Sequence, residues 1–223
     1  MLFAAGMGAR MGPLVADHPK PMIEVAGRPL IDHALRIIRD AGIDRVVVNT
    51  HYLGHVIRDH LVGSGIEISH EYPQLLDTGG GLKFALPSLG SDPVFTLNSD
   101  AVWAGDNPLR ALLAEWDATK MEALLLLVEK ENANGHNGPG DFRRTRNGRL
   151  SRGVGNVYTG AQILRTGLLR EIRESTFSLN IIWDIMQSRG RLFGVFYQGS
   201  WCDVGSATSI SVAESMLAKT GNV

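Results

Sequence analysis

The feature that most restricts the fold of this chain is the stretch Leu2–Met22, LFAAGMGARMGPLVADHPKPM. It opens with the apolar run LFAA, of the kind that forms a buried strand, which ends at Gly6 and Gly8. Glycines after a strand let the backbone come close to a ligand and direct successive N–H groups to one point, an arrangement that holds anions well. Two cations follow, Arg10 and then Lys20 between two prolines. The stretch therefore predicts a strand and a loop that binds a ligand with several phosphates.

These residues also have plainer interpretations. A lone GxG can simply make a tight turn between a strand and a helix, and Arg10 and Lys20 could be solvated surface charges. The spacing is neither that of a Rossmann GxGxxG, since Arg10 and Met11 stand near the third glycine position, nor that of a Walker-type GK[ST]. Proline on both sides fixes the backbone of Lys20. For this lysine, a functional role and a solvated surface charge are therefore about equally favoured.

The apolar pattern predicts strands alternating with helices as far as residue 128. The expected strands are 2–5, 45–49, 66–70, 94–97 and 123–128, and the expected helices are 29–42, 56–61, 82–86 and 108–116. The pattern then changes to a loop at 132–140, an Asn147-Gly148 hairpin signal, strands near 158–164 and 191–196, and helices at 180–187 and 207–217. We expect an α/β protein with a mixed, mostly parallel sheet flanked by helices and a small antiparallel insertion.

Composition excludes several classes of function. A chain of 223 residues suits one sizeable α/β domain. Its net charge of −1 provides no basic field for a nucleic-acid backbone, so we expect no nucleic-acid partner. The single cysteine, Cys202, cannot form an internal disulfide and fits a reducing compartment. No apolar run approaches the roughly 18–20 residues of a membrane span, and the start lacks the pattern of a secretory signal, so we expect no membrane association and a cytoplasmic location.

Four loops are expected beyond the carboxyl ends of strands, where open α/β sheets bind ligands: 6–10, 77–81, 98–100 and 201–205. Asp100 follows a very apolar strand, the usual placement for a Mg²⁺ ligand, and Asp203 is a second carboxylate. Either could instead cap a turn. Three successive glycines at 79–81 cost chain entropy and predict a close backbone approach to something. Cys202 has no activating neighbour, so the expected chemistry is positioning and charge neutralisation of phosphates rather than nucleophilic catalysis by the protein.

In combination these features resemble the sugar-1-phosphate nucleotidyltransferase family. The opening stretch is similar to the family signature G-x-G-x-R-M-x-P-L-T-x-x-x-P-K-P. Further matches follow in order: VAGRPLIDHAL, NTHYLG, DTGGGLKFALP, TLNSDAVW and WCDVGS. The resemblance covers nearly the whole chain. It implies a Rossmann-like nucleotidyltransferase fold in a single domain over residues 1–223, with a nucleotide-binding half at 1–128 and a sugar-phosphate-binding half at 129–223.

The resemblance also implies roles for individual residues. In this family a sugar 1-phosphate attacks the α-phosphorus of a nucleoside triphosphate in line, with Mg²⁺, and pyrophosphate leaves. The implied catalytic residues are Arg10, Lys20 and Asp100, and the implied Mg²⁺ ligands are Asp100 and Asp203. The implied nucleotide-binding residues are Ala4, Ala5, Gly6, Gly8, Arg10, Lys20, Thr78, Gly79, Gly80 and Asn98, with the backbone of 78–80 contacting the base edge. The implied sugar-phosphate-binding residues are Asp141, Asn156, Thr159, Gly160 and Asn180.

The substrates are narrowed but not fixed. The leading expectation is transfer of UMP from UTP to an amino-sugar 1-phosphate, in particular N-acetylmuramic acid α-1-phosphate, in cell-wall sugar recycling. Alternatives are GTP with mannose 1-phosphate, CTP with a phosphorylated alcohol, or a non-catalytic nucleotide-sugar-binding regulatory subunit. Asp100 and Asp203 together favour catalysis, because a binding module does not need both carboxylates. Val15 and Ser99 replace a usual threonine and glycine, and no E-K-P motif follows Val128, so the basic partner of the sugar phosphate stays open. The oligomeric state does not follow from the sequence.

Overall fold

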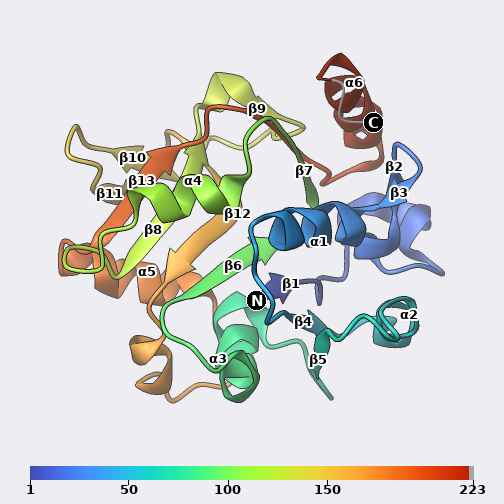
Figure 1. Cartoon of the computed structure of the whole chain (residues 1–223), viewed down its shortest axis with the longest axis horizontal. Coiled ribbons are helices and arrows are strands. Elements are labelled where there is room, and N and C mark those ends of the chain that lie inside the picture. The colour runs from blue at the N-terminus through green and yellow to red at the C-terminus, as the bar shows by residue number, and fades with distance from the viewer. Residues whose placement is uncertain (221–223) are drawn as a thin grey trace.

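The computed structural model describes residues 1–220, which form a central sheet covered by helices on both faces (Figure 1). The sheet has seven strands in the order β13-β8-β12-β6-β1-β4-β5. Their bounds are β1 Leu2–Phe3, β4 Val47–Thr50, β5 Glu67–His70, β6 Val94–Asn98, β8 Ala123–Val128, β12 Val157–Leu164 and β13 Leu192–Phe196. Only β12 runs antiparallel to its neighbours β6 and β8, and the other pairs are parallel. The predicted mixed, mostly parallel sheet is confirmed.

The helices are α1 Leu30–Asp40, α2 Gly54–His60, α3 Asp77–Leu89, α4 Pro108–Glu115, α5 Leu179–Ser188 and α6 Ala207–Lys219. Short 3-10 helices lie at η1 Ala9–Val15, η2 Lys20–Met22, η3 Lys130–Asn132 and η4 Gly167–Arg170. One hydrophobic cluster packs α1, α2 and α4 on one face of the sheet, and a second packs α3 and α5 on the other. Strand β8, with the sequence ALLLLV, contributes alternate residues to each cluster, which explains why it is apolar throughout.

A second, three-stranded sheet was not predicted. It has the order β7-β14-β9, with β7 Ala101–Ala104, β14 Ser200–Asp203 and β9 Ala133–Asn134. The expectation of a loop at 201–205 is therefore wrong for its first three residues. Val102, Ala104 and Cys202 are buried in a third cluster with α6, so these short strands carry their own core. They also place Asp203 at the end of a strand instead of on a free loop.

Two hairpins complete the fold. Strands β10 Phe142–Arg144 and β11 Leu150–Arg152 pair antiparallel around the Asn147-Gly148 turn, which confirms the predicted insertion. Strands β2 Glu24–Val25 and β3 Arg28–Pro29 form the other. Within residues 1–220, no helix has both the length and the apolar sequence that crossing a membrane requires.

Candidate active site

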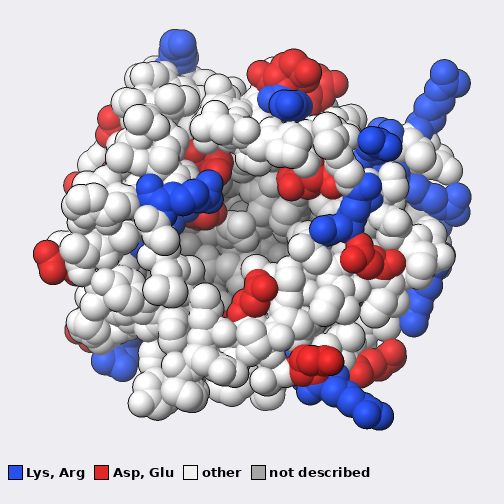
Figure 2. Space-filling model, turned by 180° about the vertical axis from the view of Figure 1, so that it is seen from behind, with Lys and Arg blue, Asp and Glu red and all other residues white. Residues whose placement is uncertain are grey.

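The site lies beyond the carboxyl ends of three parallel neighbours, β4, β1 and β6. In their register Phe3 is opposite Asn49 on one side and Asn98 on the other, so the glycine loop after β1 emerges between two polar strand ends. Here the structure has a cavity of about 210 Å³, which we call the strand-end cavity. Its lining residues are Phe3, Ala4, Ala5, Gly6, Lys20, Pro21, Asn49, Glu71, Leu75, Asp77, Thr78, Asn98, Ser99 and Asp100. Figure 2 shows this side of the molecule hollowed, with acidic and basic side chains around the opening.

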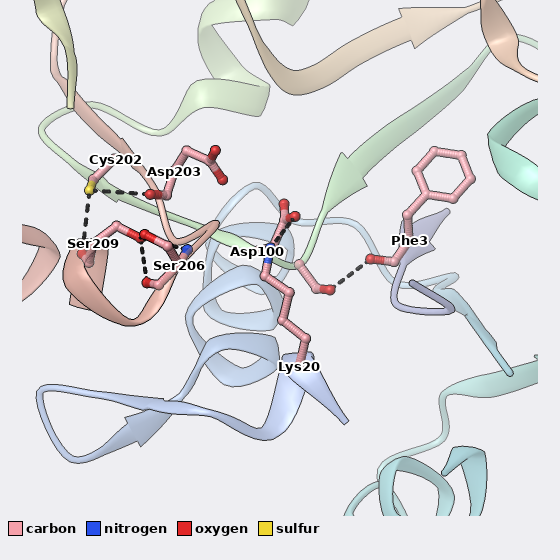
Figure 3. Close-up of polar contacts among 8 residues, drawn as sticks. Phe3, Lys20, Asp100, Cys202, Asp203, Ser206 and Ser209 are labelled. Atoms are coloured by element: carbon pink, nitrogen blue, oxygen red, sulfur yellow. Dashed lines mark hydrogen bonds and ion pairs between the residues drawn. The ribbon is translucent and has the colours of Figure 1, made fainter. Parts of the chain in front are cut away.

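Lys20 is a buried, paired cation and not a surface charge. Only 8% of the residue is exposed, and its Nζ lies 2.7 Å from Asp100 Oδ2 (Figure 3). Gly8 has φ +64°, and a Cβ there would lie 2.9 Å from Lys20 Cβ. The glycine is needed because the loop turns in a left-handed conformation directly against this lysine.

Asp203 and Arg10 lie beside the Lys20–Asp100 pair. Asp203 is opposite Ala101 in the β14–β7 register, and Val204 N donates to Asp100 O over 2.9 Å. In Figure 3 the Asp100 and Asp203 carboxylates point toward the same space. Burial, followed by the negative charge of Asp100, raises the pKa of Asp203, while nearby cations partly oppose this.

Arg10 is exposed and lies close to Asp203. A Cβ built on Gly205 would lie 2.9 Å from Asp203 Oδ2 and 3.2 Å from Arg10 Nη1, so the two side chains flank this glycine. The structure thus gathers all four charged residues that the sequence singled out, Arg10, Lys20, Asp100 and Asp203, from four separate segments.

Two buried polar residues in this site were missed from the sequence. Asn49 Oδ1 accepts a hydrogen bond from Ala4 N (2.8 Å), and its Nδ2 donates to Glu71 Oε1 (2.7 Å). Glu71 is 1% exposed, and its Oε2 accepts from Leu76 N (2.8 Å). This chain of bonds ties the glycine loop to the segment that enters α3. The available signal was a polar residue at or just after the carboxyl end of an apolar strand, the same signal that identified Asp100.

The prediction for the three glycines at 79–81 needs correction. They are not a loop, since α3 begins at Asp77 and the glycines are buried in its first turns. Gly79 N and Gly80 N both donate to Phe177 O, and Thr78 N donates to Asp77 Oδ1, so these N–H groups are occupied and do not face a base. A Cβ on Gly79 would lie 2.4 Å from Phe177, and one on Gly80 2.2 Å from Ser175 O. The close approach that the glycines predicted is made by the chain's own residues: segment 175–177 lies against Gly79 and Gly80, and Glu71 and Asn49 lie against Gly81.

A second cavity, of about 310 Å³, lies between the β10–β11 hairpin, β12 and α5, and we call it the hairpin cavity. Its lining residues are Pro139, Gly140, Asp141, Phe142, Arg152, Gly153, Val154, Tyr158, Asn180 and Trp183. Asp141 Oδ2 accepts from Tyr158 N (2.9 Å), and Asn180 Oδ1 accepts from Arg152 Nη1. Two of the five residues expected to hold the sugar, Asp141 and Asn180, therefore meet here.

The other three expected sugar-binding residues lie behind the residues that line the cavities. Asn156 N donates to Phe142 O (2.7 Å) in the backbone of the insertion. Thr159 is buried, and its hydroxyl donates to Leu126 O. Gly160 has φ +87°, and a Cβ there would lie 2.8 Å from Asn98 Cβ, so this glycine makes room for Asn98. None of the three lines either cavity as residues 1–220 form them.

The two cavities adjoin across one hydrogen bond. Leu179 N, in the first turn of α5, donates to Thr78 Oγ1 over 3.0 Å. Thr78 lines the strand-end cavity, and Asn180, the residue after Leu179, lines the hairpin cavity. The structure thus places the four clustered charges beside two cavities whose walls are joined by this bond.

Comparisons with known proteins agree with this geometry. Residues 1–176 match the family described as the MobA-like NTP transferase domain. The N-acetylmuramate alpha-1-phosphate uridylyltransferase of Caulobacter vibrioides is 35% identical, with 98% of this chain and 96% of that protein covered. The enzyme of the same name from Neisseria meningitidis serogroup B is 32% identical over 97% of this chain and 96% of that protein.

The fold is also that of solved nucleotidyltransferase structures. A putative glucose-1-phosphate thymidylyltransferase from Bacillus anthracis superposes with a TM-score of 0.80 at 18% identity, covering 96% of this chain and 92% of that one. The family model and the two relatives define a nucleotidyltransferase. The chain belongs to the MobA-like NTP transferase family and, within it, to the sugar-1-phosphate nucleotidyltransferases.

Proposed function

We propose that this nucleotidyltransferase transfers UMP from UTP to N-acetylmuramic acid α-1-phosphate and releases pyrophosphate. The observation that carries the proposal is the convergence of Arg10, Lys20, Asp100 and Asp203 beside the two adjoining cavities. The choice of substrates is supported by two relatives of that name, which align over almost the full length of the chain. The product suits recycling of cell-wall sugar in the cytoplasm, which we include in the proposal.

In this proposal residues 1–128 bind the nucleotide and residues 129–223 the sugar phosphate, within one domain. The backbone from Ala4 to Gly8 holds the nucleotide, with Ala4 fixed by its bond to Asn49. Arg10, exposed beside Asp203, binds the β- and γ-phosphates and assists the departure of pyrophosphate. Lys20 is positioned to neutralise charge at the α-phosphate as the sugar phosphate approaches it in line.

The residues present fit a divalent cation, which the family generally uses, and we propose Mg²⁺ held by Asp100 and Asp203. Both are hard oxygen donors, and their repulsion, which contributes to the raised pKa of Asp203, is what a cation would relieve. The described residues contain no group of three or more His, Cys, Asp or Glu side chains that could hold a metal ion. Two carboxylates suit Mg²⁺, which is typically bound by one or two carboxylates together with substrate phosphates. When bound, the ion supplies positive charge that offsets the repulsion between the two phosphorylated substrates.

The acceptor sugar is proposed to occupy the hairpin cavity, with Asp141 and Asn180 contacting its polar groups. Thr78, bonded to the start of α5, stands at the boundary between the two substrates. Asn98, accommodated by Gly160, lies next to Asp100 on the nucleotide side. Asn156 and Thr159 support the cavity wall through their bonds to Phe142 and Leu126.

Pyrophosphate release across a matrix of substrates tests the proposal. The nucleotides are UTP, GTP, CTP and dTTP, and the acceptors are the α-1-phosphates of N-acetylmuramic acid, N-acetylglucosamine and mannose. We expect the highest kcat/KM for UTP with the muramic acid derivative, with UDP-N-acetylmuramic acid identified by mass spectrometry. Preference for GTP and mannose 1-phosphate would overturn the substrate assignment, and release with no pair would favour a non-catalytic binding subunit.

A further inference from the structure

We propose that Arg152 is the residue that selects an acidic sugar, because its guanidinium binds the carboxylate that distinguishes a muramic acid from other hexosamines. This inference rests on the proposed function and names the substrate feature recognised in the hairpin cavity. N-acetylmuramic acid carries an ether-linked carboxylate that N-acetylglucosamine lacks. A site that prefers the first must hold one additional negative charge at the sugar end, away from the reacting phosphate.

Arg152 is held in place at the cavity by the helix that forms one wall. It is the last residue of β11, and its backbone N donates to Gln187 Oε1 of α5 (2.8 Å). Its Nη1 donates to Asn180 Oδ1, and its Nε lies 3.3 Å from Asp184 Oδ1. Three residues along α5 therefore orient this arginine toward the space between helix and hairpin.

Arg152 still has capacity to bind an anion. A guanidinium has five N–H donors in a planar fork, and Asn180 and Asp184 engage only the Nη1 and Nε groups. The side chain of Asp184 is 59% exposed, so its ion pair is screened by water and readily replaced. A ligand carboxylate can then form the stronger, bidentate contact that arginine makes with planar anions.

The charge distribution around the cavity leaves this role to Arg152. Among its described lining residues, Arg152 is the one cation and Asp141 the one anion. Asp141 is engaged by Tyr158 N, and its charge would repel a carboxylate placed next to it. The neighbouring Arg143 donates its Nε to Val154 O and does not line the cavity. An acidic substituent would therefore lie at the α5 side, against Arg152.

The test compares two acceptors that differ by this carboxylate, with UTP as the donor. N-acetylmuramic acid α-1-phosphate and N-acetylglucosamine α-1-phosphate are measured as substrates, or the second as a competitive inhibitor, for wild type, Arg152→Met, Arg152→Lys and the control Arg143→Met. For Arg152→Met we expect KM for the acidic sugar to rise about 10- to 100-fold, with a much smaller rise for the neutral sugar, which loses only the support that Arg152 gives to Asn180. KM for the acidic sugar should be intermediate in Arg152→Lys, between wild type and Arg152→Met. In Arg143→Met it should equal the wild-type value.

A second variant guards against a simple folding defect. Asp184→Asn removes the competing carboxylate while it retains the shape of the side chain, and should lower KM for the acidic sugar about two- to fivefold without affecting the neutral one. Equal losses for both sugars in Arg152→Met would overturn the inference and assign Arg152 to the shared phosphate. If Arg152→Met kept the wild-type kinetic constants for both sugars, Arg152 would have no part in sugar binding, and the inference would be wrong. Wild-type enzyme that accepts neither sugar with UTP would instead refute the proposed function itself, and this inference with it.

Discussion

The strand-end cavity and the hairpin cavity adjoin, yet they are built in different ways. Around the first, the bonds that fix the wall join residues far apart in sequence, such as Ala4 with Asn49 and Lys20 with Asp100, and the partners are largely buried. Around the second, Asp141 is held by Tyr158, 17 positions away, and the rim residue Val154 is 59% exposed. One cavity lies within the core, and the other lies between the core and an insertion whose rim is exposed.

This difference separates two requirements of the reaction. Bringing together phosphates and a cation demands fixed charges in a site of restricted hydration, which only residues anchored in the core can provide. Distinguishing one sugar from another demands shape and a few polar contacts, which a hairpin can supply and can change without disturbing the sheet. We therefore expect substitutions at the strand-end cavity to affect turnover or stability strongly, and those at the hairpin cavity to affect mainly KM for the sugar.

The largest effect is expected at the two carboxylates proposed to hold the metal. Asp203→Asn should lower kcat/KM by about 100-fold or more, because it removes one of the two charged oxygen ligands proposed for the cation. When no metal is bound, the same substitution should instead stabilise the fold. Burial and Asp100 raise the pKa of Asp203 above its ordinary value of 3.8, so the ionised side chain costs stability in the folded state. In EDTA at pH 8, the melting temperature of Asp203→Asn should lie about 2 °C above that of wild type.

The pH dependence checks the sign of this effect. The cost of ionised Asp203 appears as pH rises above the unfolded carboxyl pKa and is complete above the raised folded pKa, so the gain in Asp203→Asn should vanish near pH 4. Asp141→Asn, the matched change in the hairpin cavity, should alter KM for the sugar with little change in kcat. A variant Asp203→Asn that melts lower than wild type in EDTA at pH 8, or turns over normally, would contradict the assignment.

Much of the strand-end cavity could be predicted from the sequence, because its residues sit at the ends of apolar strands. The apolar strand β6 pointed to Asp100 just after its end. The glycines after β1 predicted a close backbone approach, and in the structure Gly8 makes it against Lys20. Asn49 and Glu71 follow the same rule, but neither is next to a glycine motif in the sequence. Their importance appears only when the register puts Asn49 opposite Phe3.

The glycines at 79–81 show where such reasoning fails. Their cost in chain entropy correctly indicated a close contact, but entropy does not identify the partner. For Gly79 and Gly80 the partner is segment 175–177, almost 100 residues later, and no local pattern contains that information. For the same reason β7 and β14 were missed, since strands of four residues gain their stability from α6 and from each other.

A tightly packed glycine should therefore give the second largest effect, on stability. Gly80→Ala puts a Cβ 2.2 Å from Ser175 O, a backbone atom that cannot move without displacing the start of α5. Overpacking of this kind costs about 1–3 kcal/mol, which should lower the melting temperature by about 5 °C or more. Gly167→Ala is the control, because a Cβ there meets nothing within 4 Å, and it should melt within about 2 °C of wild type. Equal melting of the two variants would refute the packing role of Gly80.

The hairpin cavity was predictable only in part. The Asn147-Gly148 turn located the insertion, and the family resemblance indicated Asp141 and Asn180, which the structure brings to one cavity. Arg152 carried no signal, because one arginine in a polar hairpin looks like any surface cation. Its position became meaningful only when α5, nearly 30 residues further along, was found to hold it.

The smallest effect is expected at the rim of the hairpin cavity. Val154 lies between two glycines, with Gly153 at φ +144°, and is 59% exposed, so Val154→Ser removes little buried surface. It should melt within about 1 °C of wild type and change KM for the sugar by no more than about threefold. Leu75→Ser makes the same kind of change in the strand-end cavity, at a half-buried leucine, and should lower both melting temperature and affinity for the nucleotide. If Val154→Ser destabilised the protein as much as Leu75→Ser, the rim of the hairpin cavity would be as tightly packed as the strand-end cavity, and substitutions at this rim could not alter sugar preference without a loss of stability.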